Sequence, residues 1–148
     1  SALENVLVGA VYGHPGRRRD ARAQALGALK LVGLAGQRER RAAQMTLSDR
    51  RLLEIARAMA CRPTVVLLDE PMAGLNAIEI EATIAVIRRI RSERGVAVLW
   101  VEHKVDAIMN VCDRVVVLDH GEKIADGTPA EVICDRHVIE AYLGEPVA

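Results

Sequence analysis

Four consecutive apolar residues that end in two carboxylates constrain the fold of this chain most strongly. Residues 65–68 read Val-Val-Leu-Leu, and Asp69 and Glu70 follow them directly. A continuous apolar run of this length predicts a strand buried on both faces, as in a parallel sheet covered by helices. Ligands of such sheets gather at the carboxyl ends of the strands. We therefore expect Asp69 and Glu70 to lie at a functional edge, although a buried strand followed by a polar turn is the simpler alternative.

A helix and a second strand are predicted after this first strand. Asn76 is expected to be the N-cap of the helix, because Glu79 stands at the third helical position and can complete a capping box. Isoleucines recur at helical spacing after it, and Gly95 follows the last turn. The second apolar run, residues 96–101, precedes Glu102 and His103.

The crossover between the two strands predicts where three polar side chains lie. A strand-helix-strand connection is right-handed and makes both strands parallel. Asp69, Glu70 and His103 are therefore expected on the same edge of one sheet, where two acids and a histidine can converge.

The order of these motifs resembles the ATP-binding subunit of ABC transporters, and the resemblance covers nearly the whole chain. Asp69 and Glu70 resemble the Walker B end, residues 73–76 (Ala-Gly-Leu-Asn) the D-loop, and His103 the switch histidine. Residues 45–49 (Met-Thr-Leu-Ser-Asp) occupy the place of the Leu-Ser-Gly-Gly-Gln signature. Residues 112–118, 121–122, 127–129 and 138–144 are similar to the branched-chain amino-acid importer branch. Urea, lipid or lipopolysaccharide-linked transporters remain open as alternatives within the class.

The resemblance implies a role for each of these residues, with ATP and Mg²⁺ as cofactors. Asp69 would hold Mg²⁺ through water, Glu70 would orient or deprotonate the attacking water, and His103 would reach the γ-phosphate. The residues implied in nucleotide binding are Thr46, Leu47, Ser48, Asp49, Gly74, Leu75 and Asn76.

The implied fold class is α/β, a partial P-loop NTPase (ABC ATPase) fold in which a helical subdomain precedes a mostly parallel sheet with flanking helices. Residues 1–62 would form the helical, signature-containing subdomain, with one helix near 17–33. Residues 63–148 would form the C-terminal part of the RecA-like ATPase core with its terminal helices. No segment fits Gly-x-x-x-x-Gly-Lys-Ser/Thr, the loop whose N-H groups and lysine hold phosphates. The chain is therefore expected to be the C-terminal portion of a larger subunit, lacking the Walker A and Q-loop regions and inactive alone.

The signature segment departs from the family pattern. Ser48 stands in a glycine position and Asp49 replaces glutamine. A carboxylate near phosphate is unfavourable unless a cation offsets it, and Arg50 and Arg51 are the adjacent candidates. Ser48 or Asp49 could instead N-cap the helix that runs to about Ala60. Asn76 in place of the D-loop aspartate is a further departure, which its capping role explains. Hydrolysis could thus be slow, the site could be the degenerate member of a heterodimer, or the chain could be a non-catalytic docking module.

Two local patterns are predicted toward the C-terminus. Residues 119–122 (Asp-His-Gly-Glu) are typical of a hairpin turn. Thr128 precedes Pro129 and stands three residues before Glu131, which predicts a capped helix start. Three dispersed cysteines without metal-binding spacing are expected to be reduced.

Implied partners are a second ATP-binding subunit, in a homo- or heterodimer, and integral membrane permease subunits, with a substrate-binding protein acting indirectly. The expected location is peripheral, on the cytoplasmic face of the inner or plasma membrane. No nucleic-acid partner is expected, since the net charge is zero and two tyrosines and one tryptophan offer few stacking platforms. The fragment is expected to self-associate, because the absence of the N-terminal strands uncovers apolar edges of its sheet.

Overall fold

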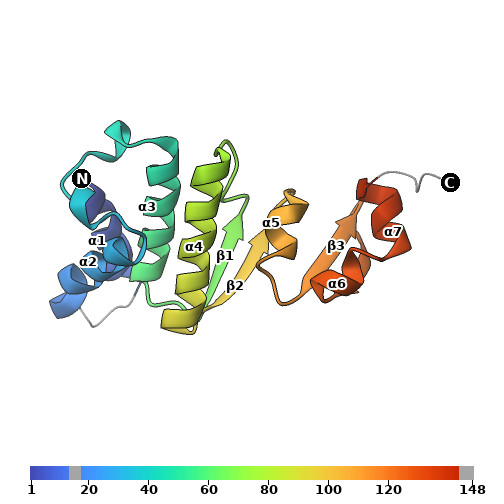
Figure 1. Ribbon diagram of the computed structural model, residues 1–148. Coiled ribbons are helices and arrows are strands. Elements are labelled where there is room, and N and C mark those ends of the chain that lie inside the picture. Colours follow the sequence, from blue (N-terminus) through green and yellow to red (C-terminus); the bar gives the residue numbers. More distant parts are fainter. Residues whose placement is uncertain (14–17, 144–148) are drawn as a thin grey trace. The chain divides into compact units, whose positions relative to one another are not determined.

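The computed structural model describes residues 1–13 and 18–143, and its contacts divide the chain into two units, residues 1–101 and 102–148 (Figure 1). The first unit begins with three helices: α1 (Ala2–Tyr12), α2 (Ala21–Leu31) and α3 (Leu47–Ala60). Short 3-10 turns cover Arg18–Asp20, Ala35–Gln37 and Ala42–Gln44. The helix predicted near 17–33 is therefore shorter, and its residue 17 lies outside the described residues.

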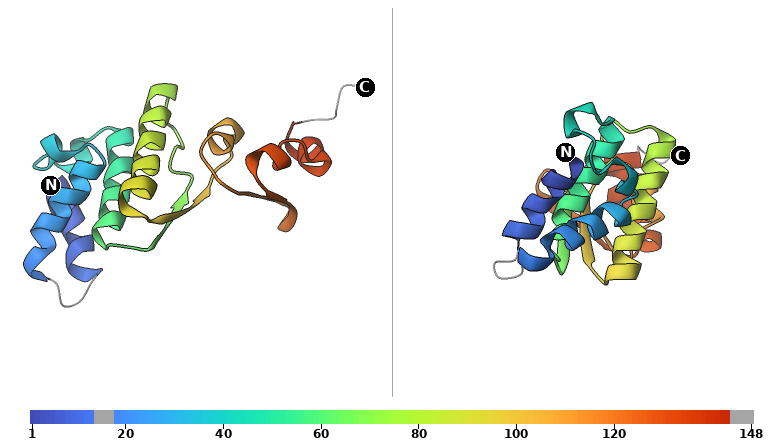
Figure 2. Two further views of the ribbon diagram at one scale, coloured as in Figure 1. Left: turned by 60° about the horizontal axis from the view of Figure 1, so that its bottom comes forward. Right: turned by 90° about the vertical axis from the view of Figure 1, so that its left-hand side faces the viewer.

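The three helices pack on one another (Figure 2). Their core consists of small and branched apolar side chains. Val6 and Leu29 are fully buried in this core. Helix α1 passes very close to α3 at Gly9, where an added Cβ would stand 2.3 Å from the Arg57 carbonyl oxygen. Only a residue without a side chain fits at such a crossing.

The strand-helix-strand unit predicted from the sequence is confirmed. Strands β1 (Val65–Asp69) and β2 (Ala97–Val101) pair in parallel, with α4 (Ala77–Arg94) between them in the chain. Asn76 and Glu79 form the predicted capping box, and Gly95 ends the helix in the left-handed conformation at φ 62°.

The prediction that β1 is buried on both faces is wrong. Val66 and Leu68 are buried in the same core as Ile87 and Ile90 of α4. Val65 and Leu67, on the other face, are 52% and 71% exposed. Successive side chains of a strand point to opposite faces, and within the described residues of the first unit only one face of this two-stranded sheet is covered. The bare face continues onto β2, where Leu99 and Val101 are also exposed.

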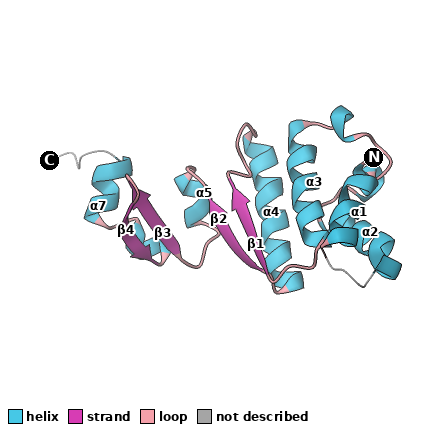
Figure 3. Cartoon of the chain, turned by 180° about the vertical axis from the view of Figure 1, so that it is seen from behind, coloured by secondary structure: helices cyan, strands magenta, loops and turns pink. Residues whose placement is uncertain are grey.

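The second unit is a hairpin with short helices, seen from behind in Figure 3. Strands β3 (Val115–Asp119) and β4 (Glu122–Gly127) pair antiparallel through the predicted turn, where His120 and Gly121 have φ 48° and 86°. Positive φ at both central positions suits the twist of a two-residue hairpin turn. Helix α5 (Val105–Met109) precedes the hairpin, and α6 (Pro129–Val132), α7 (Arg136–Val138) and a π turn (Ile139–Leu143) follow it.

The predicted start of α6 is confirmed in detail. The Thr128 hydroxyl accepts from the Glu131 N-H, and the Glu131 carboxylate accepts from the Thr128 N-H. Cys61, Cys112 and Cys134 are free thiols, as predicted. Among the described helices, none is long and apolar enough to cross a membrane.

Candidate functional site

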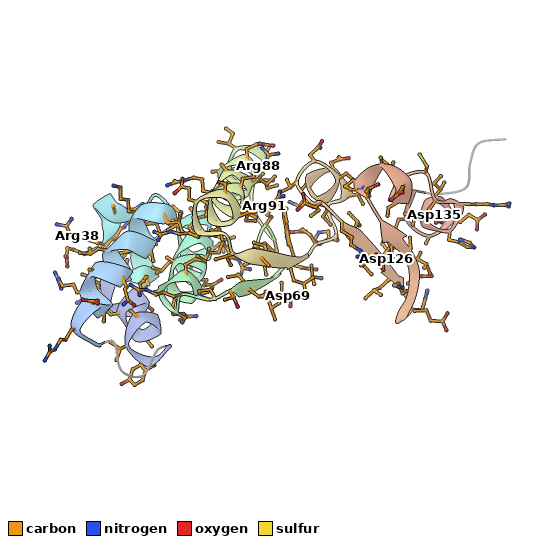
Figure 4. The ribbon with its side chains drawn as sticks, turned by 90° about the horizontal axis from the view of Figure 1, so that it is seen from below. Arg38, Asp69, Arg88, Arg91, Asp126 and Asp135 are labelled. Carbon is orange, nitrogen blue, oxygen red and sulfur yellow. The ribbon has the colours of Figure 1, made fainter. Side chains whose placement is uncertain are left out.

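Asp69 and Glu70 lie at the carboxyl end of β1, and both are exposed. Asp69 is labelled in Figure 4. Asp69 is paired in register with Val101, the last residue of β2. The Glu70 N-H donates to the Val101 carbonyl at 2.9 Å, and Glu70 then turns with φ 44°. Both carboxylates therefore stand where two parallel strands end, as the sequence predicted.

Residues 70–76 form two consecutive tight turns after the strand. The Ala73 N-H donates to the Glu70 carbonyl at 3.1 Å, and the Leu75 N-H donates to the Met72 carbonyl at 3.2 Å. Gly74 has φ 77°, a conformation that favours glycine. Met72 is fully buried and Leu75 is 7% exposed, so buried side chains anchor the loop on both sides of Gly74.

Thr46 caps helix α3, so the alternative in which Ser48 or Asp49 is the N-cap is wrong. The Thr46 hydroxyl accepts from the Asp49 N-H at 3.1 Å, and Leu47 is the first helical residue. Met45 is buried just before the cap, which fixes the entry of the chain, and Ser48 is buried within the first turn. In this arrangement the Thr46 O-H still has its proton to donate to an anion.

The helix start also carries backbone donors. The first N-H groups of any α-helix have no intrahelical acceptor, and the helix dipole makes this end electropositive. Leu47 and Ser48 occupy the first two helical positions of α3. Together with the Thr46 hydroxyl, their N-H groups can hold an oxygen of a phosphate.

The signature-like and D-loop-like segments meet within the first unit. A Cβ added to Gly74 would stand 3.0 Å from Cδ2 of Leu47. Since Gly74 follows Glu70 by four residues, this contact ties the start of α3 to the loop behind the two carboxylates. The structure thus brings together two of the segments that the sequence predicted to bind nucleotide.

Asp49 has a partner that the sequence did not predict. Its Oδ2 accepts from the Gln37 side-chain N-H at 3.1 Å, whereas Arg51 pairs with Glu54 at 3.3 Å. The offset of the Asp49 charge by Arg50 or Arg51 stays a prediction. Gln37 lies twelve residues before Asp49 in a connecting segment, and no local pattern joins two such positions.

His103 lies in the second unit, just before α5. Its side chain is 62% exposed, and its Nδ1 is 3.4 Å from the Glu102 carboxylate, whose own side chain is buried. The same carboxylate accepts from the His103 N-H at 2.9 Å and from the Lys104 N-H at 3.4 Å. The predicted convergence of His103 with Asp69 and Glu70 stays a prediction.

The described residues contain no group of three or more histidine, cysteine or acidic side chains able to hold a metal ion. Asp69 offers one hard oxygen ligand at an exposed strand end, which suits Mg²⁺ because this ion keeps most of its waters. The chain can therefore supply one part of a Mg²⁺ site.

Comparison with known families gives two matches. The model of a family described as ABC transporter matches residues 1–73. The model of a family described as branched-chain amino acid ATP-binding cassette transporter matches residues 122–148. The two matches lie at opposite ends of the chain.

Curated relatives extend the likeness over most of the chain. The chain is 42% identical over 127 residues, 86% of its length, to the high-affinity branched-chain amino acid transport ATP-binding protein BraF of Pseudomonas aeruginosa. It is 38% identical over 117 residues, or 79%, to LivG of Salmonella typhimurium, a protein with the same description. It is 36% identical over 134 residues, or 89%, to the methionine import ATP-binding protein MetN of Burkholderia thailandensis. These matches cover 50%, 46% and 39% of the relatives, so the chain spans about half the length of the curated relatives it matches.

Solved structures agree with the sequence relatives. An ATP-binding cassette of an ABC transporter in its ADP conformation matches 98% of this chain with a TM-score of 0.82 and 26% identity, over 63% of its own length. A Clostridium perfringens protein that is part of the ABC transporter complex cbiONQ matches 95% of this chain with a TM-score of 0.83 and 26% identity, over 55% of its own length.

Proposed function

Because the chain belongs to the ATP-binding cassette family of transporter proteins, we propose that it is the C-terminal part of a subunit that binds and hydrolyses ATP to power an importer. Its fold is a partial P-loop NTPase fold, as in the solved cassettes that match it. The observation that carries the proposal is the pair Asp69 and Glu70 at the end of β1, directly before the loop that meets the signature-like segment.

Each residue then has a task in phosphoryl transfer. Asp69 would hold Mg²⁺, through water, and the ion would supply positive charge that offsets the charge of the phosphates. The Glu70 carboxylate, next in the chain, orients the attacking water and accepts its proton. The exposed His103 donates to the γ-phosphate and links the site to conformational change.

The signature-like segment acts on the nucleotide of the second subunit. Thr46 donates its hydroxyl proton, and the N-H groups of Leu47 and Ser48 complete the cradle. Gly74, Leu75 and Asn76 place the loop that joins this cradle to Glu70. In this proposal, residues 1–62 are the helical subdomain that carries the signature-like segment. Residues 63–148 are the C-terminal part of the ATPase core.

We propose branched-chain amino acids as the imported substrate. The family match at residues 122–148 and the descriptions of BraF and LivG support this choice. The partners are a second ATP-binding subunit, membrane permease subunits and, indirectly, a substrate-binding protein. The subunit then works at the cytoplasmic face of the membrane.

Turnover of Mg-ATP by the full-length subunit tests the proposal. Glu70→Gln removes the proton acceptor but keeps the shape of the side chain, so we expect turnover to fall by at least about 100-fold while Mg-ATP binding persists. Glu93→Gln is the matched control, because Glu93 is an exposed glutamate of α4 that pairs only with a neighbouring arginine in the described contacts. Equal turnover in both variants would contradict the role of Glu70.

A non-catalytic docking module is the second candidate, and the acidic residue at position 49 of the signature-like segment favours it. In that case the full-length subunit would bind Mg-ATP weakly or not at all, and Glu70→Gln would leave its function intact. The 148-residue chain alone is expected to lack tight Mg-ATP binding under either candidate, since it has no phosphate loop. Tight binding in a calorimetric titration of this chain would contradict that expectation.

A further inference from the structure

The carboxylate of Asp49 lies in the first turn of α3, next to the donors that would hold a phosphate. A negative charge at this place interacts well with the helix dipole but repels a phosphate that approaches the same helix end. A signature-like segment with this acid therefore needs a way to keep the carboxylate turned away from its donors.

The side chain of Gln37 forms a hydrogen bond with the Asp49 carboxylate. Its amide N-H donates to Asp49 Oδ2 at 3.1 Å, and its amide oxygen accepts from the Arg40 guanidinium at 3.0 Å. Arginine can only donate and a carboxylate can only accept, so the amide has one orientation that satisfies both neighbours. Gln37 and Asp49 are both half-buried, which shields their hydrogen bond from water.

The segment that carries Gln37 and Arg40 is itself anchored to the first helix. The Ala2 N-H donates to the Arg40 carbonyl at 2.8 Å, and the Leu3 N-H donates to the Arg38 carbonyl at 2.9 Å. Within the segment, the Arg40 N-H donates to the Gln37 carbonyl at 2.9 Å. The start of α1 and the start of α3 are thus connected through Gln37.

We propose that Gln37, oriented by Arg40, is a positioning residue that clamps the Asp49 carboxylate to residues 37–40 and so keeps the start of α3 open to a phosphate of the partner subunit's nucleotide. This inference rests on the proposed function of the signature-like segment. The clamp acts through the charge of Asp49, which distinguishes it from a purely structural contact.

The test is a double-mutant cycle in the full-length subunit. Gln37→Leu releases Asp49, and we expect the KM for Mg-ATP to rise about fivefold, the factor for one net hydrogen bond, with kcat little changed. In an Asp49→Asn background, where no charge is left to hold, Gln37→Leu should change KM by less than about twofold. Gln44→Leu is the matched control, since Gln44 is an exposed glutamine of the same connecting region. If Gln37→Leu changes the KM for Mg-ATP equally with Asp49 present and with Asp49→Asn, the proposal is overturned.

A second measurement separates this inference from the proposed function. The same cycle, followed by urea unfolding of the 148-residue chain, requires no nucleotide. The clamp predicts that Gln37→Leu and Asp49→Asn together lower the folding equilibrium constant by less than the product of their separate effects. If the two substitutions change the folding equilibrium constant independently of each other, the clamp is overturned, even if the full-length subunit hydrolyses ATP. Coupled unfolding without any ATP turnover would instead support the clamp geometry and contradict the proposed function.

Discussion

The helical part, residues 2–60, and the β1–β2 pair differ in how completely each covers its own apolar side chains. Val6 and Leu29 of the helices are fully buried, in a core that also includes residues of α4 and β1. The two strands bury one face on α4 and leave the other bare, with Leu67 71% and Leu99 61% exposed. A helix satisfies its backbone locally, whereas a two-stranded sheet is marginal until further strands or layers join it. The strands therefore depend on additional surface to cover their second face.

The largest expected effect is on the free energy of unfolding when a leucine is replaced by alanine. The same substitution is made in the helical part and in β1 to test the difference in burial. Leu29→Ala leaves a cavity in the helical core and should lower the free energy of unfolding by about 3 kcal/mol. Leu67→Ala removes the same atoms from the bare face of β1 and should cost less than about 0.5 kcal/mol. Urea unfolding of both variants measures the two values. Similar losses would mean that the face of Leu67 is covered.

The same contrast explains which features the sequence could predict. The capping boxes at Asn76 and Thr128, the left-handed Gly95 and the turn at His120 were all predictable, because each depends on hydrogen bonds between residues at most four apart. The parallel pairing of β1 and β2 was predictable as well, because the handedness of the crossover leaves one arrangement.

Features that depend on the packing of distant segments could not be predicted. Thr46, Ser48 and Asp49 are all good N-cap residues, and the burial of Met45 decides that Thr46 takes this position. The hydrogen bond between Gln37 and Asp49 follows from the placement of a whole connecting segment. In the candidate site, the strand-end position of Asp69 and Glu70 was therefore predictable, and the partner of Asp49 was not.

Self-association of the 148-residue chain is the next prediction, since the bare face of β1 and β2 has no cover among the first unit's described residues. Burial of apolar surface between two copies would remove Leu67 and Leu99 from water. Light scattering should therefore show a mass above that of one chain, rising with concentration. Leu67→Lys should return the chain toward the monomer, because a lysine cannot be buried in such a contact without a large penalty.

Ile78→Lys is the control for this experiment. Ile78 is 83% exposed, at the start of α4 and outside the strands. Its replacement should leave the measured mass unchanged. A monomer at high concentration before any substitution would show that the bare face does not pair in solution.

The smallest effect is expected in the second unit, where an exposed ion pair joins Arg114, just before β3, to Asp126 of β4 beside a small apolar core. Hydrogen bonds from Arg114 at 2.7 Å and Lys123 at 3.0 Å lower the pKa of Asp126 from 3.8 to about 2 (Figure 4). Because the pKa is lower in the folded state, the stabilising effect is present above pH about 4 and is lost as the pH falls toward 2. These groups are exposed, so solvent and salt screen the interaction and its effect on global stability is small.

An NMR titration of the Asp126 carboxyl measures this interaction directly. We expect a midpoint of about 2 in the unchanged chain and a shift toward 3.8 in Arg114→Gln, since the largest cause of the lowered pKa is then removed. Arg136→Gln is the matched control, because Arg136 pairs with Glu140 in the same unit and should leave the Asp126 midpoint in place. If Arg114→Gln leaves the midpoint near 2, the hairpin is not held by this pair. A shift confined to Arg114→Gln would show that Arg114 causes the lowered pKa of Asp126, an exposed charge interaction beside the small apolar core of this unit.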